Sequence, residues 1–242
     1  MNYYSKRSGF TLAETLITIG IIGVVSALTI PNVINKYRAK TFETLFKKSY
    51  SNISQAYEKT KSDLGVFNLS EIYTVYQQGK GYYLASEFIN AFDKNLRVVK
   101  IINTYTPITN YNGTKTVTSN AGNNFPSCNK ILYDGSSYGT LINASKINVF
   151  VDINGPYKGP NRYGHDVFKF VITRGGNKIE PVKESKQYTE EELKNIPSPD
   201  IAGQPCNLTS NQGGNGFGCS WYAVNNICPY DNTKKYWDCL PK

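Results

Sequence analysis

One stretch of the chain constrains the fold more than any other. The 28 residues from Ser8 to Asn35 contain a single ionisable side chain, Glu14, although the 242-residue protein has 27 Lys and Arg and 18 Asp and Glu. Within this stretch, the apolar run from Phe10 to Ile34 would span about 37 Å as a helix. Because a hydrocarbon core is about 30 Å thick, we predict a membrane-spanning helix over residues 10–34.

Glu14 is unusual in such a segment, because a carboxylate inside a bilayer needs a partner or a purpose. The first interpretation is a secretory signal peptide, for which Val25-Ser26-Ala27 provides a small-residue cleavage site. The second is a plain signal anchor, and the third is a segment in which Glu14 has a charged partner. In each case Lys6 and Arg7 hold the short leader on the cytoplasmic side of the membrane.

The residues around Glu14 carry a family resemblance. The sequence GFTLAETL, which begins at Gly9, resembles the cleavage and methylation motif of type IV prepilins and type II secretion pseudopilins. The resemblance implies that residues 1–9 are a leader, that a prepilin peptidase cuts between Gly9 and Phe10, and that the new amine of Phe10 is methylated. It also implies that Glu14 meets the N-terminal amine of a neighbouring subunit during assembly.

Pro31 interrupts the apolar run where related pilins also carry a proline. Inside a helix it removes the hydrogen bond to the carbonyl of Ala27, so we predict a kink or a loosened turn. The alternative is that Pro31 simply ends the membrane helix.

Beyond residue 34 the pattern becomes amphipathic, and we predict that the helix continues over residues 35–64 to a stop at Asp63-Leu64-Gly65. Apolar residues recur at three- and four-residue steps and are expected to pack on a globular domain: Phe42, Leu45, Phe46, Tyr50, Ile53 and Tyr57.

Residues 65–242 are predicted to form a globular α+β head. A second helix is expected over residues 86–97, with Phe88, Ile89, Phe92 and Leu96 inward, and a loop over 104–124. Antiparallel strands follow over 130–133, 138–142, 147–153 and 167–173, and capping-box spacing predicts a short helix over 190–195. This order resembles the type IV pilin fold, a long N-terminal helix packed on an antiparallel sheet.

The strongest motif in the head runs from Val151 to Phe168 and includes the turn signal Asn154-Gly155. Similar strings occur in the heads of some secretion-type pilins. Asp152, Asn154 and Asp166 are hard oxygen ligands, and the resemblance to calcium-binding pseudopilins makes calcium a candidate cofactor. A turn without metal is the competing interpretation, because the glycine comes too early for an EF-hand loop and no glutamate closes it.

Five cysteines lie outside the membrane segment, and no pair has Cys-x-x-Cys spacing. Outside the cytoplasm they favour disulfides that staple the C-terminal region. At most two bridges form, which leaves 15 possible arrangements open among Cys128, Cys206, Cys219, Cys228 and Cys239. The string Gly218-Cys219-Ser220-Trp221 resembles a late strand of related heads, which implies that Cys219 is bonded to a loop.

The predicted function is structural and non-enzymatic, because the one histidine, His165, has no candidate triad. The resemblance implies a single-pass protein of the bacterial inner membrane, with its head outside the cytoplasm, that assembles into a periplasmic or surface filament. The implied partners are further copies of the chain, other pilins, the prepilin peptidase, the inner-membrane assembly platform and, before assembly, lipid. A second hypothesis is that the head binds DNA or another polyanion, since the net charge is +9, or +7 once Lys6 and Arg7 are removed with the leader.

Overall fold

The computed structural model describes residues 9–78, 81–82, 85–103, 107–113, 116–117, 128–143, 146–173, 177–187, 189–195 and 204–241. The predicted leader lies outside these ranges except for Gly9. The chain divides into two compact units, Met1–Lys40 and Thr41–Lys242, and the boundary between them falls inside the first helix.

The first helix, α1 (Leu12–Leu64), ends where the sequence predicts. Gly65 adopts a left-handed conformation, with φ at 63°. Its N–H donates to the carbonyl of Ser62 at 3.2 Å, and the N–H of Val66 donates to the carbonyl of Lys61 at 3.0 Å. This is a Schellman motif, in which a residue without a Cβ satisfies the last carbonyls of the helix.

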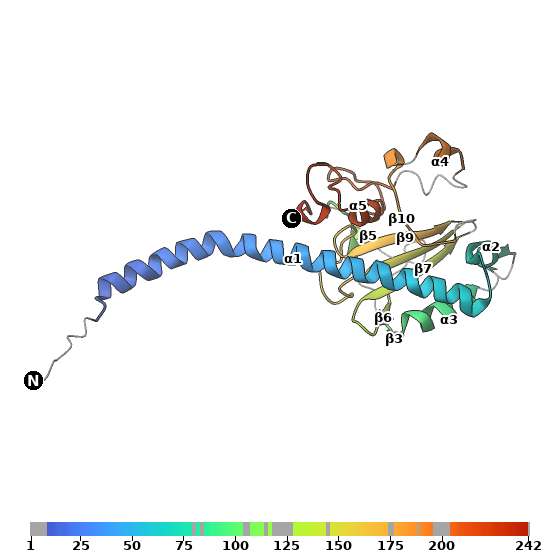
Figure 1. Ribbon diagram of the computed structural model, residues 1–242, viewed down its shortest axis with the longest axis horizontal. Helices are drawn as coiled ribbons and strands as arrows, with labels where there is room; N and C mark the ends of the chain where they lie inside the picture. Colours follow the sequence, from blue (N-terminus) through green and yellow to red (C-terminus); the bar gives the residue numbers. More distant parts are fainter. Residues whose placement is uncertain are drawn as a thin grey trace, which may run out of the picture. The chain divides into compact units, whose positions relative to one another are not determined.

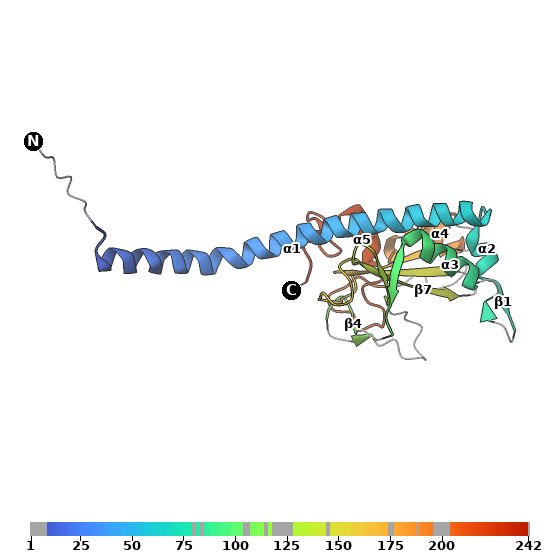
Figure 2. The ribbon, with the colours of Figure 1, turned by 90° about the horizontal axis from the view of Figure 1, so that it is seen from below.

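The part of α1 within the second unit lies along the sheet of the head (Figures 1 and 2). The ring of Phe46 lies 4.6 Å from that of Phe168, and Tyr50 stacks on Phe170 at 5.1 Å. The predicted apolar stripe is therefore the packing face. This packing face also includes small residues that are not part of the predicted stripe, namely Ser49, Ala56 and Thr60. The buried residues of α1 are Phe46, Ser49, Ile53, Ala56, Tyr57 and Thr60.

The head contains a six-stranded antiparallel sheet, which confirms the predicted α+β fold. The strands, in spatial order, are β10 (Glu180–Pro181), β9 (Val167–Thr173), β8 (Lys146–Asp152), β7 (Ser137–Asn143), β6 (Lys130–Leu132) and β3 (Val98–Ile101). The four predicted strands correspond to β6 to β9, each within two residues at either end. Asp134 makes the turn between β6 and β7, where its carboxylate accepts the N–H of Ser136 at 3.1 Å.

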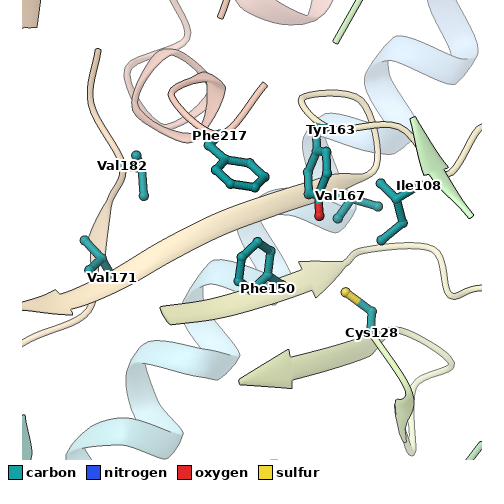
Figure 3. Close-up of a cluster of buried hydrophobic side chains, with 8 residues drawn as sticks. All are labelled: Ile108, Cys128, Phe150, Tyr163, Val167, Val171, Val182 and Phe217. Atoms are coloured by element: carbon teal, nitrogen blue, oxygen red, sulfur yellow. The ribbon is translucent and has the colours of Figure 1, made fainter. Parts of the chain in front are cut away.

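Both faces of the central strands are covered. On β9, Phe168 and Phe170 face α1, whereas Val167 and Val171 belong to a cluster on the opposite face. Figure 3 shows this cluster, which the structure builds from Ile108, Cys128, Phe150, Tyr163, Val167, Val171, Val182 and Phe217. Burial on two sides explains why every residue of β8 is buried, including the polar residues Lys146, Asn148 and Asp152.

Helix α3 (Ala85–Leu96) confirms the second predicted helix, with Phe88, Phe92 and Leu96 buried and Ile89 half-buried. The short helix α4 (Glu190–Asn195) is also where it is predicted. The smaller elements are α2 (Leu69–Tyr73), β1 (Tyr76–Gln77), β2 (Gly81–Tyr82), β4 (Ile108–Thr109), β5 (Thr116–Val117), and two 3-10 helices, η1 (Ser185–Gln187) and η2 (Tyr236–Asp238).

Two predictions about the head need correction. In the segment predicted as a loop over 104–124, the described residues 107–113 and 116–117 contain the β4–β5 pair, in which Ile108 pairs with Val117 and Thr109 with Thr116. The rest of this predicted loop lies outside the described residues. The late strand expected at Gly218-Cys219-Ser220-Trp221 is instead the start of a helix, α5 (Cys219–Asn225). This helix ends at Asn226, which has a left-handed conformation.

Candidate functional site

The first turn of α1 contains the residues on which the sequence prediction depends. Gly9 and Phe10 precede the helix and are exposed. The carboxylate oxygen Oε2 of Glu14 accepts the N–H and the hydroxyl of Thr11, both at 2.8 Å, and the N–H of Glu14 donates to Oγ1 of Thr11 at 3.3 Å. Thr11 and Glu14 thus form a capping box, which satisfies backbone groups at the start of the helix.

The capping box gives Glu14 a local role that the sequence analysis missed, although the spacing Thr-x-x-Glu indicates it directly. The box leaves the charge of Glu14 uncompensated, because Thr11 is neutral. Within the described residues, the carboxylate of Glu14 accepts two hydrogen bonds, and Oε2 is the acceptor in both. The other oxygen, Oε1, therefore retains the capacity to accept a donor such as an amine.

The apolar residues that follow are not covered by the chain. The large apolar side chains from Phe10 to Ile34 are between 49% and 89% exposed. By length and composition α1 is able to cross a membrane, and none of its most apolar stretch is buried. A contiguous apolar surface of this size is typical of a segment that binds lipid or other protein.

Pro31 lies inside this apolar stretch. Helix α1 continues through it, so Pro31 does not end the membrane helix. Because proline has no backbone N–H, the carbonyl of Ala27 loses its usual helical partner. The loosening of the helix at this turn stays a prediction. The alternative, in which the helix ends at Pro31, is wrong because α1 continues to Leu64.

The candidate metal ligands of the head meet in one buried turn. Oδ1 of Asp152 accepts the N–H groups of Asn154 at 3.3 Å and Gly155 at 2.9 Å. Asp166 accepts the N–H of Asn161 at 2.8 Å and that of Arg162 at 2.7 Å. Burial, and then the neighbouring Asp166, raises the pKa of Asp152 well above its usual range. Burial also raises the pKa of Asp166, to about 6.

This geometry matches the turn interpretation. Gly155 has φ at 88°, and a Cβ there would meet the carbonyl oxygen of Gly135 at 2.2 Å, so the turn requires glycine. Both aspartates already hold backbone N–H groups. Within the described part of the chain, no three His, Cys, Asp or Glu side chains are grouped to hold a metal ion. The donor set does not fit a cation cage in this conformation, and calcium binding stays a prediction.

His165 does not form a catalytic pair with Asp166. Its ring lies beside that of Tyr111, with centroids 5.8 Å apart. Burial, and then the positive charge of Arg162, lowers the pKa of His165 to about 3. The imidazole is therefore neutral and enclosed at physiological pH, as expected for a structural residue.

The structure selects one of the 15 possible cysteine arrangements. Cys206 bonds to Cys219, and Cys228 bonds to Cys239, so each bridge joins residues close in sequence. The predicted link from Cys219 to a loop is confirmed. Cys128 is the free, buried thiol. Its pKa is raised by burial and then by Asp152 and Asp166, which makes it a poor nucleophile.

A buried glutamate that sequence reasoning missed anchors the first bridge. Oε1 of Glu184 accepts the N–H of Cys206 at 2.7 Å, and Oε2 accepts the hydroxyl of Tyr222 at 2.5 Å. Lys186 pairs with the same carboxylate at 3.0 Å. Glu184 thus connects the segment after β10, the Cys206 loop and α5. Its sequence context gives no sign of this role, because residues 180–204 are rich in charged residues and proline, a composition typical of an exposed segment.

Comparison with known proteins identifies the N-terminal motif. Residues 4–30 match the family model described as the prokaryotic N-terminal methylation motif, which is the motif of type IV prepilins and pseudopilins. The match includes Gly9, Phe10, Thr11 and Glu14. No curated protein and no solved structure matches the chain. The chain therefore carries the prepilin motif, which supports a processed, type IV pilin-like subunit.

Proposed function

We propose that the chain is a pilin or pseudopilin that polymerises into a type IV pilus or a type II secretion filament. A prepilin peptidase removes residues 1–9 by cutting between Gly9 and Phe10, and the amine of Phe10 is methylated. The mature subunit waits in the inner membrane, with residues 10–34 in lipid and the head outside the cytoplasm. It then enters a periplasmic or surface filament through the assembly platform.

The observation that carries this proposal is the methylation motif at residues 4–30, placed on an uncovered apolar helix. The uncovered surface needs two successive environments in this mechanism. Lipid covers it before assembly, and the equivalent helices of other subunits cover it in the filament. In lipid and in the filament alike, the apolar side chains are kept out of water, so the helix can move from one to the other without unfolding.

Glu14 supports the same mechanism, because its charge is not neutralised by Thr11. In the filament the N-terminal amine of an adjacent subunit approaches Oε1 and forms an ion pair. An ion pair in a low-dielectric surrounding is stronger than one in water. A subunit that arrives out of register leaves this carboxylate without its partner, so the contact also selects the correct axial position.

N-terminal sequencing and intact mass of the protein purified from its membrane test this proposal. The expected product begins at Phe10 and carries one additional methyl group on its amine. A product that begins near Leu28, after Val25-Ser26-Ala27, identifies the segment as a signal peptide and refutes the proposal. An unprocessed chain that begins at Met1 identifies a plain signal anchor, which refutes it as well.

A further inference from the structure

The surface of the head has an open pocket, called the cavity below, to which the proposed assembly assigns no role. It has a volume of about 640 Å³ and lies between η1, α5 and the loop closed by the Cys228–Cys239 bridge. Figure 1 shows α5 beside the C-terminal coil that forms this region. Cavities of about 300–1,000 Å³ are typical of sites for small molecules or for single units of a polymer.

The loop that forms one wall of the cavity is held by several cross-links. Besides the disulfide, the hydroxyl of Tyr230 donates to the carbonyl of Cys239. Oδ1 of Asp231 accepts the N–H of Thr233 at 3.1 Å, and the N–H of Lys234 donates to the carbonyl of Asp231 at 3.0 Å. A wall fixed in this way loses little conformational freedom when a ligand binds.

Three aromatic rings line the cavity: Trp221, Tyr222 and Tyr230. Trp221 and Tyr222 meet edge to face, with ring centroids 5.2 Å apart. Tyr230 is 50% exposed although it is a large side chain on a cross-linked loop. Aromatic faces carry partial negative charge, and they attract the partially positive C–H groups on the face of a pyranose ring.

The polar lining is neutralised within the protein. Lys234 pairs with Asp231 at 2.8 Å, and Lys186 pairs with Glu184 at 3.0 Å. A phosphate polymer would have to break these pairs to use the two lysines. Hydroxyl groups, in contrast, accept from a paired ammonium and donate to a paired carboxylate without separating them. The amide of Gln187 adds a further polar group to this lining.

From these observations we propose that the cavity binds a neutral saccharide unit. A pyranose ring lies against the aromatic rings of Trp221 and Tyr230, and its hydroxyls bond to Lys186, to the Lys234–Asp231 pair and to Gln187. A site of this kind would allow the head to contact glycans of a cell wall or of another cell. The inference does not depend on the proposed filament function, because it concerns only the head.

Tryptophan fluorescence provides a direct test, because the chain has two tryptophans and Trp237 is only 3% exposed. The full chain is reconstituted in lipid nanodiscs, which avoids sugar-based detergents, and is titrated with triacetylchitotriose, lactose and maltotriose. We expect a saturable change in Trp221 emission with at least one saccharide, with a Kd below about 10 mM. Absence of a saturable change with all three saccharides overturns the proposal.

Variants locate the site. Trp221→Phe should remove the fluorescence change, and Tyr230→Ala should weaken binding at least about tenfold when it is measured by calorimetry. Tyr157→Ala is the matched control, because Tyr157 is 70% exposed and lies outside the cavity lining. Equal binding by all three variants places the saccharide elsewhere and overturns the assignment. Competition by heparin or a short DNA duplex identifies the cavity as a polyanion site and overturns it too.

Discussion

Glu184 offers the sharpest test of how the C-terminal region is held together, because one carboxylate joins three segments. Glu184→Ala leaves the N–H of Cys206 and the hydroxyl of Tyr222 without their acceptor. Hydrogen bonds to a charged group contribute about 1.5–3 kcal/mol each. We therefore expect the free energy of unfolding of the head to fall by about 3–5 kcal/mol.

Two further variants separate the hydrogen bonds from the ion pair. Glu184→Gln keeps one oxygen acceptor but loses the charge, so its cost should be intermediate, about 1–3 kcal/mol. Lys186→Ala removes the ammonium and its aliphatic stem but leaves the hydrogen bonds from Cys206 and Tyr222 to Glu184 in place. Because the Lys186 side chain is 59% exposed, this variant should cost about 0–1 kcal/mol. The predicted order of destabilisation is Glu184→Ala, then Glu184→Gln, then Lys186→Ala.

Urea unfolding followed by tryptophan fluorescence measures this order, since Trp221 and Trp237 both lie near the region concerned. The disulfides are kept intact in all variants and are checked by mass spectrometry without reduction. If Lys186→Ala destabilises the head as much as Glu184→Ala, the carboxylate acts through its ion pair. The hydrogen bonds from Cys206 and Tyr222 to Glu184 then contribute little, which refutes the predicted order of destabilisation.

Three other predictions concern the motif, the buried turn and the first bridge. Glu14→Gln keeps the capping box but removes the charge, so this variant should be cleaved by the peptidase but should assemble poorly. Thr11→Ala removes the capping box but keeps the charge of Glu14, so it should assemble better than Glu14→Gln. The reverse order in the yield of sheared filaments would show that Glu14 acts only as a helix cap. Asp152→Asn keeps the Oδ1 acceptor and removes repulsion, so it should stabilise the head at pH 7, by about 1.4 kcal/mol for each pKa unit relieved. A carboxyl with a raised folded-state pKa favours folding as the pH falls through that value, so in wild type this pair should add stability between pH 7 and pH 4. In thermal melts the variant should lose the part of this gain that comes from Asp152 and keep the part from Asp166, whose pKa is raised by its own burial. A wild-type melting temperature that rises with calcium, and a variant that does not respond, would instead support a metal site. Replacing Cys206 and Cys219 by Ser should cost about 3 kcal/mol from loop closure alone, and an unchanged urea midpoint would show that Glu184 holds this loop without the bridge.

Several features of the fold could be predicted from the sequence because they depend on local signals. The end of α1 follows from a single glycine, and the strands from β6 to β9 follow from short apolar runs between turn residues. The inward residues of α3 follow from helical spacing. In each case a few neighbouring residues decide the structure, so no knowledge of distant contacts is needed.

Other features depend on contacts between distant parts of the chain. Cys219 begins helix α5 and not a strand, and this helix is tied to distant residues through the bond from Cys219 to Cys206 and the hydrogen bond from Tyr222 to Glu184. The pairing of five cysteines cannot be derived from their spacing. Glu184 is polar in sequence, but it is buried because Cys206 and Tyr222 both bring hydrogen-bond donors to it. The capping box at Thr11 was the exception, since its signal is local and readable.

The positions of the bridges have a consequence for the order in which the head can oxidise. In the proposed topology, export begins at the membrane helix, and Cys128 reaches the oxidising side 78 residues before Cys206. The strands β8 and β9 also emerge in this interval, and they supply much of the cluster that encloses the Cys128 sulfur. The sheet can thus shield the unpaired thiol before any partner arrives. The four remaining cysteines then emerge in the order Cys206, Cys219, Cys228, Cys239. If each emerging cysteine bonds to the preceding unpaired cysteine, the native bridges form without isomerisation. Mass mapping of the bridges in arrested export intermediates tests this order, and a Cys128–Cys206 bridge would contradict it.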